Sequence, residues 1–230
     1  MEIPNMLVPM NVTRVRYPVA AIALMLMTFA LHANPLLPGA TVAPDVFTGS
    51  GTPPLLGDST GTFNFGGGVT GSYEDAVLLD PFGVTCSGCL DFAYQISLDP
   101  SSPYPIFTSD LTAFFGYTTD VGYITGSGNA VPNSVTRGPF GGSVDFNFNT
   151  ATSVLLPGES TDFFVVATNA TGYDTNGVLG ITGGSVTQSV SGQIDGLFEP
   201  TPVPEPSTAL LLSLGLAGIA AFRKRLAVQI

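Results

Sequence analysis

The sequence is poor in positively charged side chains. It has six Lys and Arg residues in 230, and between Asn34 and Pro206 the only one is Arg137. The same stretch holds every acidic residue except Glu2, which leaves it with a net charge of about −15. Such a surface repels nucleic acid, because binding phosphates requires Lys and Arg. It also repels anionic lipid, so the ordinary consequence of the charge is solubility in water.

Histidine is almost absent, and this excludes several kinds of enzyme. The single histidine, His32, and the single lysine, Lys224, both lie in terminal segments that we expect to be separated from the working domain. A Ser-His-Asp, Cys-His or Ser-Lys nucleophile is therefore impossible there. Paired carboxylates remain available by residue type, with Glu74, Asp75 and Asp120 as candidates. Glu74 and Asp75 are adjacent, and adjacent residues on a strand point to opposite faces, which argues against their acting together. We interpret all three acids as solvated turn acids and predict no enzyme.

Only two cysteines are present, Cys86 and Cys89, in a C-x-x-C arrangement. Covalent haem would require His at the position of Leu90, zinc would require further ligands, and a thioredoxin-like pair would require a βαβ setting. These exclusions leave a local disulfide that pins the turn before a strand at 91–98, and the export signals described below favour it because the extracellular compartment is oxidising. We predict no cofactor and no metal. The segment 174–177 contains part of a calcium-loop pattern without its closing Glu, and a turn is the better interpretation.

The N-terminal region has the features of a secretory signal. Arg14 and Arg16 precede an apolar stretch at 19–31, which is too short for a stable membrane span. Ala33 is the expected residue before the cut, which makes Asn34 the first residue of the mature chain, and a cut after Ala30 is the alternative. We expect residues 1–33 to be a signal peptide handled by the export machinery and signal peptidase, with Met1, Met6 or Met10 as the true start.

The C-terminal region predicts a short transmembrane helix. The uncharged run 207–222 would reach about 24 Å as a helix, against about 30 Å for a hydrocarbon core. The basic residues that follow should remain cytoplasmic, which leaves the preceding domain outside. The proline-rich segment 201–206 cannot join a helix or a central strand, so we expect an extended stalk. Residues 207–230 then form the helix and its basic tail.

The same residues resemble a known sorting signal. Val203, Pro204, Glu205 and Pro206, an apolar helix, and then Arg223, Lys224 and Arg225 are similar to the tripartite PEP-CTERM sorting domain. The resemblance implies processing by exosortase, a membrane cysteine protease-transpeptidase. It implies transient anchoring in the inner membrane, then a place at the cell surface or in the extracellular matrix of a Gram-negative bacterium that makes exopolysaccharide, biofilm or floc.

The region between the two ends, residues 34–200, reads as one all-β domain. Phe92, Tyr94, Ile96 and Leu98 alternate with smaller or polar residues, and Val144, Phe146 and Phe148 alternate with Asp145 and Asn147. Further strands are expected at 73–79, 107–117, 160–168, 178–182 and 185–190, and Gly66–Gly68 as a bend or bulge. Many short strands separated by Gly and Pro favour an antiparallel β-sandwich, with a jelly roll as the close variant.

These features predict a structural or interaction protein of the matrix that binds polysaccharide. Tyr104, Tyr117 or Tyr123 could stack on sugar rings if one sandwich edge exposed them, although a buried aromatic is the ordinary case. The alternatives are a carboxylate-based glycosidase, which needs two acids across a cleft, and a calcium-dependent adhesin, which calcium should stabilise.

Overall fold

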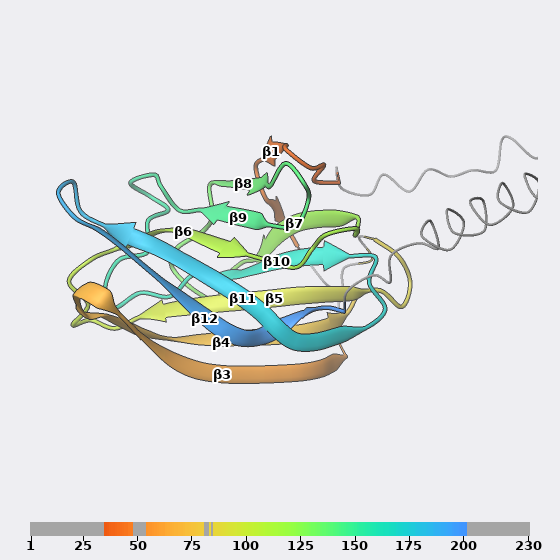
Figure 1. Cartoon of the computed structure of the whole chain (residues 1–230), viewed down its shortest axis with the longest axis horizontal. Coiled ribbons are helices and arrows are strands. Elements are labelled where there is room, and N and C mark those ends of the chain that lie inside the picture. The colour runs from red at the N-terminus through yellow and green to blue at the C-terminus, as the bar shows by residue number, and fades with distance from the viewer. Residues whose placement is uncertain (1–34, 48–53, 81–82, 84, 202–230) are drawn as a thin grey trace, which may run out of the picture. The chain divides into compact units, whose positions relative to one another are not determined.

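The computed structural model describes residues 35–47, 54–80, 83 and 85–201. Their regular structure consists of strands and one short 3-10 turn, Gly66–Gly68, so the expectation of an all-β domain is confirmed (Figure 1). The strands form two six-stranded sheets. One sheet, called sheet A, has the spatial order β1 (Thr41–Val42), β8 (Ser134–Arg137), β9 (Val144–Asn147), β6 (Ile106–Leu111), β11 (Tyr173–Gly184) and β12 (Ser189–Pro200).

The other sheet, called sheet B, contains the longest meander of the fold. Its spatial order is β2 (Asp45–Val46), β7 (Thr119–Ile124), β10 (Phe163–Thr168), β5 (Leu90–Leu98), β4 (Val69–Leu79) and β3 (Leu55–Phe65). All neighbours pair antiparallel except β2 and β7, which are parallel, so this sheet is mixed where an antiparallel one was expected. Consecutive strands β3, β4 and β5 pair within sheet B, and β8–β9 and β11–β12 are hairpins within sheet A, which is not the strand order of a jelly roll.

The two sheets pack face to face around one aromatic core. Phe146 on β9 and Phe164 on β10 come from different sheets, and their ring centroids are 4.8 Å apart. At the side of the sandwich where β12 lies over β3 and β4, Tyr94 on β5 donates a hydrogen bond to the carbonyl oxygen of Phe198 on β12 at 2.6 Å (Figure 1). The backbone N–H of Phe198 donates to the Asp75 carboxylate at 2.7 Å. These contacts join the sheets in addition to their apolar burial.

The alternating patterns located the core strands correctly. Phe92, Ile96, Val144 and Phe146 are all fully buried in the shared core, as alternation predicts. The strand expected at 107–117 ends earlier, because Ala113 has a φ of 76° and leaves the extended conformation.

Two other expectations require correction. Of the strand expected at 185–190, residues 185–188 are instead the tip of the β11–β12 hairpin, and only the last two residues belong to β12. At the tip the backbone N–H of Ser185 donates to the carbonyl oxygen of Gln188 at 2.7 Å. The turn expected at 174–177 lies inside β11, where the register to β12 shifts between Asp174 and Val178. The extra residues are absorbed as a β-bulge, so the chain continues along the same strand.

Both terminal signals lie outside the described residues. This applies to the signal peptide with its cleavage at Ala33 and Asn34, to the sorting residues Val203–Pro206 and Arg223–Arg225, and to the transmembrane helix expected at 207–222. Within the part of the chain that the structure describes, no helix is long and apolar enough to cross a membrane.

Candidate functional site

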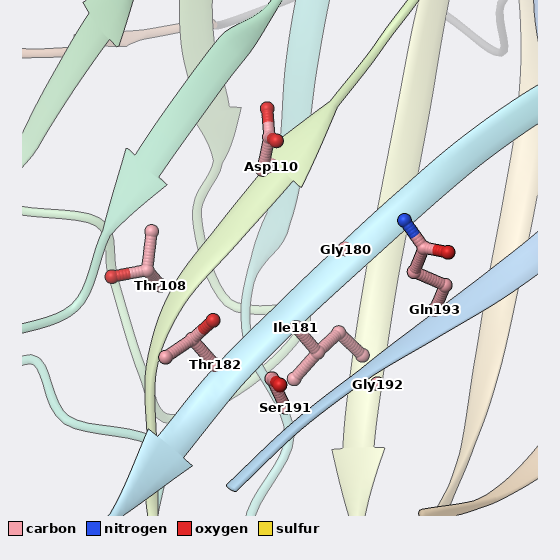
Figure 2. A pocket seen from close by; sticks show the side chains of 8 residues that line it. All are labelled: Thr108, Asp110, Gly180, Ile181, Thr182, Ser191, Gly192 and Gln193. Carbon is pink, nitrogen blue, oxygen red and sulfur yellow. The ribbon is translucent and has the colours of Figure 1, made fainter. Parts of the chain in front are cut away.

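The outer face of sheet A carries polar side chains from several neighbouring strands. Core residues such as Phe146 and Ile181 point inward, so their neighbours in sequence point outward. The strand register places these outward residues in two rows, Asp145, Asp110, Gly180 and Gln193 in one and Asn147, Thr108, Thr182 and Ser191 in the other. We call these eight residues the polar face, and Figure 2 shows the part of it that lies on β6, β11 and β12.

A hollow of about 420 Å³ lies in the polar face. Its floor is Gly180, which has no side chain, while Asp110 and Gln193 stand on either side of it in the same row (Figure 2). A Cβ atom placed on Gly180 would meet the Asp110 Cβ at 3.6 Å, an ordinary contact distance. The glycine is therefore not required by crowding, and a side chain at this position would occupy the hollow.

Two acids face each other beside this hollow. Asp110 on β6 lies directly opposite Asp145 on β9, where like charges are unfavourable. Burial raises the pKa of Asp110 to about 7, and its hydrogen bond and charge interaction with Asp145 add to the rise. Near neutral pH Asp110 is therefore protonated in part of the molecules, and in that form its carboxyl group can donate a hydrogen bond as well as accept one.

The chemistry of the polar face suits a ligand rich in hydroxyl groups. Hydroxyls of Thr108, Thr182 and Ser191 and the amide of Gln193 can each donate and accept hydrogen bonds. The register places Asp110 directly opposite Asp145 on the neighbouring strand, which adds carboxyl oxygens that can accept hydrogen bonds. The described residues also contain no group of three or more His, Cys, Asp or Glu placed to hold a metal ion.

Of the three acids that the sequence singled out, Asp75 and Asp120 are buried, whereas Glu74 is exposed on β4. Glu74 and Asp75 point to opposite faces of β4, as predicted, but Asp75 is fully buried and bonds to β12, so its interpretation as a solvated turn acid was wrong. Asp120 is also buried, at the start of β7, and its carboxylate accepts from the backbone N–H of Val121 at 2.8 Å. Burial raises the pKa of Asp120 to about 6.

The three candidate tyrosines do not share a surface. The Tyr104 hydroxyl bonds to Gln188 at the β11–β12 hairpin, and the Tyr117 hydroxyl bonds to the carbonyl oxygen of Thr201. Tyr123 lies on β7 in sheet B. Each is partly buried, so the structure does not bring them together as a stacking edge for sugar.

The cysteine pair lies where the sequence suggested. Cys86 and Cys89 are at disulfide distance in the turn that precedes β5, with their Cα atoms 5.3 Å apart. Cys89 is buried and Cys86 is exposed, and the Cys89 N–H donates to the Cys86 carbonyl oxygen at 3.1 Å. The pair therefore closes a tight turn at the edge of the core.

Sequence reasoning missed Asp110, Gly180 and Gln193 as candidates. Alternation around Val144 and Phe146 already put Asp145 on the outward face, but its partner Asp110 is 35 positions earlier in the chain. Only the strand register joins the two, and register depends on contacts that are distant in sequence.

Comparison with known protein families identifies a match at the C-terminus. Residues 202–225 match the PEP-CTERM protein-sorting motif, which confirms the resemblance noted in the sequence. The motif implies that the protein is exported, anchored in the membrane before processing, and processed by exosortase. No curated protein and no solved structure matches the chain.

Proposed function

We propose that this protein is a non-catalytic component of the extracellular matrix that holds a neutral polysaccharide on the polar face of sheet A. The observation that carries the proposal is the row formed by Asp145, Asp110, Gly180 and Gln193, with the hollow over Gly180. Such a surface offers many hydroxyl and carboxyl partners at shallow depth, which fits an extended chain of sugar hydroxyls better than a compact small molecule.

The charge of the exported region narrows the class of ligand. With a net charge of about −15 between Asn34 and Pro206, the domain repels polyanions such as uronic-acid polymers. A neutral polysaccharide meets no such repulsion. Export through the sorting motif supports the proposal further, because it delivers the domain to the compartment where such polymers accumulate.

The test uses the mature protein recovered from its host and the exopolysaccharide purified from the same strain. Gly180→Val should fill the hollow, because the Cβ position contacts nothing closer than the Asp110 Cβ at 3.6 Å and valine suits a strand. We expect binding to weaken by about tenfold, equivalent to ~1.4 kcal/mol, with an unchanged melting temperature. Thr60→Val on the outer face of sheet B is the matched control and should bind like the unaltered protein.

The same samples separate binding from hydrolysis and from calcium-dependent adhesion. Release of reducing ends from the polysaccharide, abolished by Asp110→Asn, would replace the proposal with a glycosidase. Binding that requires calcium and is lost in a chelator would replace it with a calcium-dependent adhesin. Equal binding by the Gly180→Val variant and the unaltered protein would remove the polar face from the account.

A further inference from the structure

Three exposed apolar side chains gather at one end of the domain. Leu37, Phe115 and Phe140 are 63%, 69% and 84% exposed, and all three line a hollow of about 550 Å³. They come from three separate loops, at 35–40, 112–118 and 138–143, and we call them the terminal apolar patch. A gathered apolar surface of this kind marks a contact site more often than scattered single residues do.

The patch is held in place by the only basic residue of the exported region. Arg137 is buried, and its guanidinium donates to backbone carbonyl oxygens from all three loops. The acceptors are Leu36 at 2.9 Å, Phe114 at 3.1 Å, Tyr117 at 2.7 Å and Gly141 at 3.0 Å. The loops are therefore tied to one centre, and the apolar side chains are displayed by a fixed backbone.

Both ends of the domain meet at this patch. Near the N-terminal end, the backbone N–H of Leu36 donates to the carbonyl oxygen of Thr119 at 2.7 Å. At the C-terminal end, the Tyr117 hydroxyl donates to the carbonyl oxygen of Thr201. The sorting motif begins at the next residue, and the uncharged run begins at Ser207. The residues 202–206 between them can span at most about 18 Å, so the membrane-anchored precursor keeps this end close to the bilayer.

The charge of the three loops matches that position. The exported region is strongly acidic, yet residues 35–40, 112–118 and 138–143 contain no Asp or Glu. The three loops themselves therefore add no repulsion from anionic headgroups, unlike the acidic segments of the exported region. Phenylalanine and leucine side chains at this height can enter the interfacial region of a bilayer.

We propose that the terminal apolar patch rests on the lipid surface of the membrane that anchors the precursor. The contact orients the domain and holds the stalk at 201–206 at the membrane face until exosortase releases it. The released protein then exposes the patch. This inference depends on the membrane-anchored precursor. It is independent of polysaccharide binding, because the terminal apolar patch shares no residue with the polar face.

The chain contains no tryptophan, so single tryptophans can report on the contact. The full-length precursor would carry Phe140→Trp or, as control, Val186→Trp at the exposed tip of the β11–β12 hairpin. The twelve-residue β12 separates that tip from Thr201 by roughly 40 Å. Both positions are exposed, so both variants should fold, which far-ultraviolet circular dichroism checks.

Each precursor is reconstituted into phosphatidylethanolamine–phosphatidylglycerol vesicles, with or without a lipid brominated near the headgroup. We expect the Phe140→Trp emission to shift to shorter wavelength and to lose intensity with brominated lipid, while the Val186→Trp emission changes in neither respect. Equal quenching of both tryptophans, or of neither, overturns the proposal. A blue shift without quenching would mean that protein covers the patch. Quenching that requires added exosortase would mean that the enzyme places the patch at the membrane. Either result also overturns the proposal.

Discussion

Asp91 offers a sharp test of how the fold tolerates a buried carboxyl group. It lies on β5 with its side chain on the outer face of sheet B, opposite Leu78 on β4 and Ala167 on β10. The residue is fully buried, and within the described structure neither carboxylate oxygen has a hydrogen-bond partner. An ionised carboxylate is strongly disfavoured in such a place.

The free-energy cost of ionising Asp91 follows from its pKa. Burial raises the pKa of Asp91 from 3.8 to about 8, the negative charges of Asp80 and Asp120 add to the rise, and the nearby backbone N–H of Thr168 offsets only part of it. At ~1.4 kcal/mol for each pH unit, ionising Asp91 in the folded state costs roughly 6 kcal/mol as an upper limit. Because the pKa of Asp91 is higher in the folded state, the protonated side chain contributes stability to the fold. That contribution is fully present below the unfolded pKa near 3.8 and is lost as the pH rises towards 8.

Asp91→Asn removes the ionisation while keeping the size of the side chain. We expect the variant to be more stable than the unaltered domain by roughly 2–4 kcal/mol above about pH 8, and the advantage to vanish near about pH 4. Urea unfolding of the mature protein, followed by circular dichroism across this pH range, measures the difference. Asp195→Asn at an exposed position is the control and should show little effect. A stability difference for Asp91→Asn that does not change with pH would refute the reasoning.

Three further predictions address the base, the cysteines and the export signal. Arg137→Lys should lower the free energy of unfolding by about 3 kcal/mol or more, because an ammonium group cannot serve four carbonyl groups in the place of a guanidinium; an unchanged urea midpoint would contradict this. The exported protein should have the mass of a Cys86–Cys89 disulfide, and replacing both with Ser should cost less than ~2 kcal/mol; alkylation of both thiols without reductant would reject the pair. N-terminal sequencing of surface protein should begin at Asn34, and recovery of residues 14–30 would exclude cleavage there.

The strands that the sequence predicted well are those with a clear apolar period. Phe92 to Leu98 and Val144 to Phe148 alternate large apolar residues with smaller or polar ones, and both segments lie on the core. Strands β3 and β12 were missed or misplaced because Gly57, Gly61, Gly192 and Gly196 interrupt their pattern. Neighbouring aromatic rings fill two of these gaps, Tyr73 over Gly61 and Phe65 over Gly192, and this compensation is visible only once the strands are paired.

The candidate site was less accessible from sequence than the fold. The facing pair Asp110 and Asp145 depends on the pairing of β6 with β9, and the hollow depends on Gly180 lying next to Asp110 in the following strand. Composition did identify Arg137 as unusual, but its role depends on carbonyl groups from three loops. Local pattern predicts which face a residue occupies, whereas partners across strands and loops are set by tertiary packing.

The central claim is that this protein is an exported substrate of exosortase, and changing the sorting motif tests it most directly. Pro204-Glu205-Pro206 would be replaced with Ala residues in the host, leaving the apolar run and Arg223-Lys224-Arg225 intact. The prolines keep the stalk extended at the outer face of the membrane, whereas alanine allows the helix to continue through it. The account predicts that the variant stays uncut in the inner membrane, while the unaltered protein is shortened and leaves it. A variant that matures and leaves the inner membrane at the unaltered rate would contradict the claim.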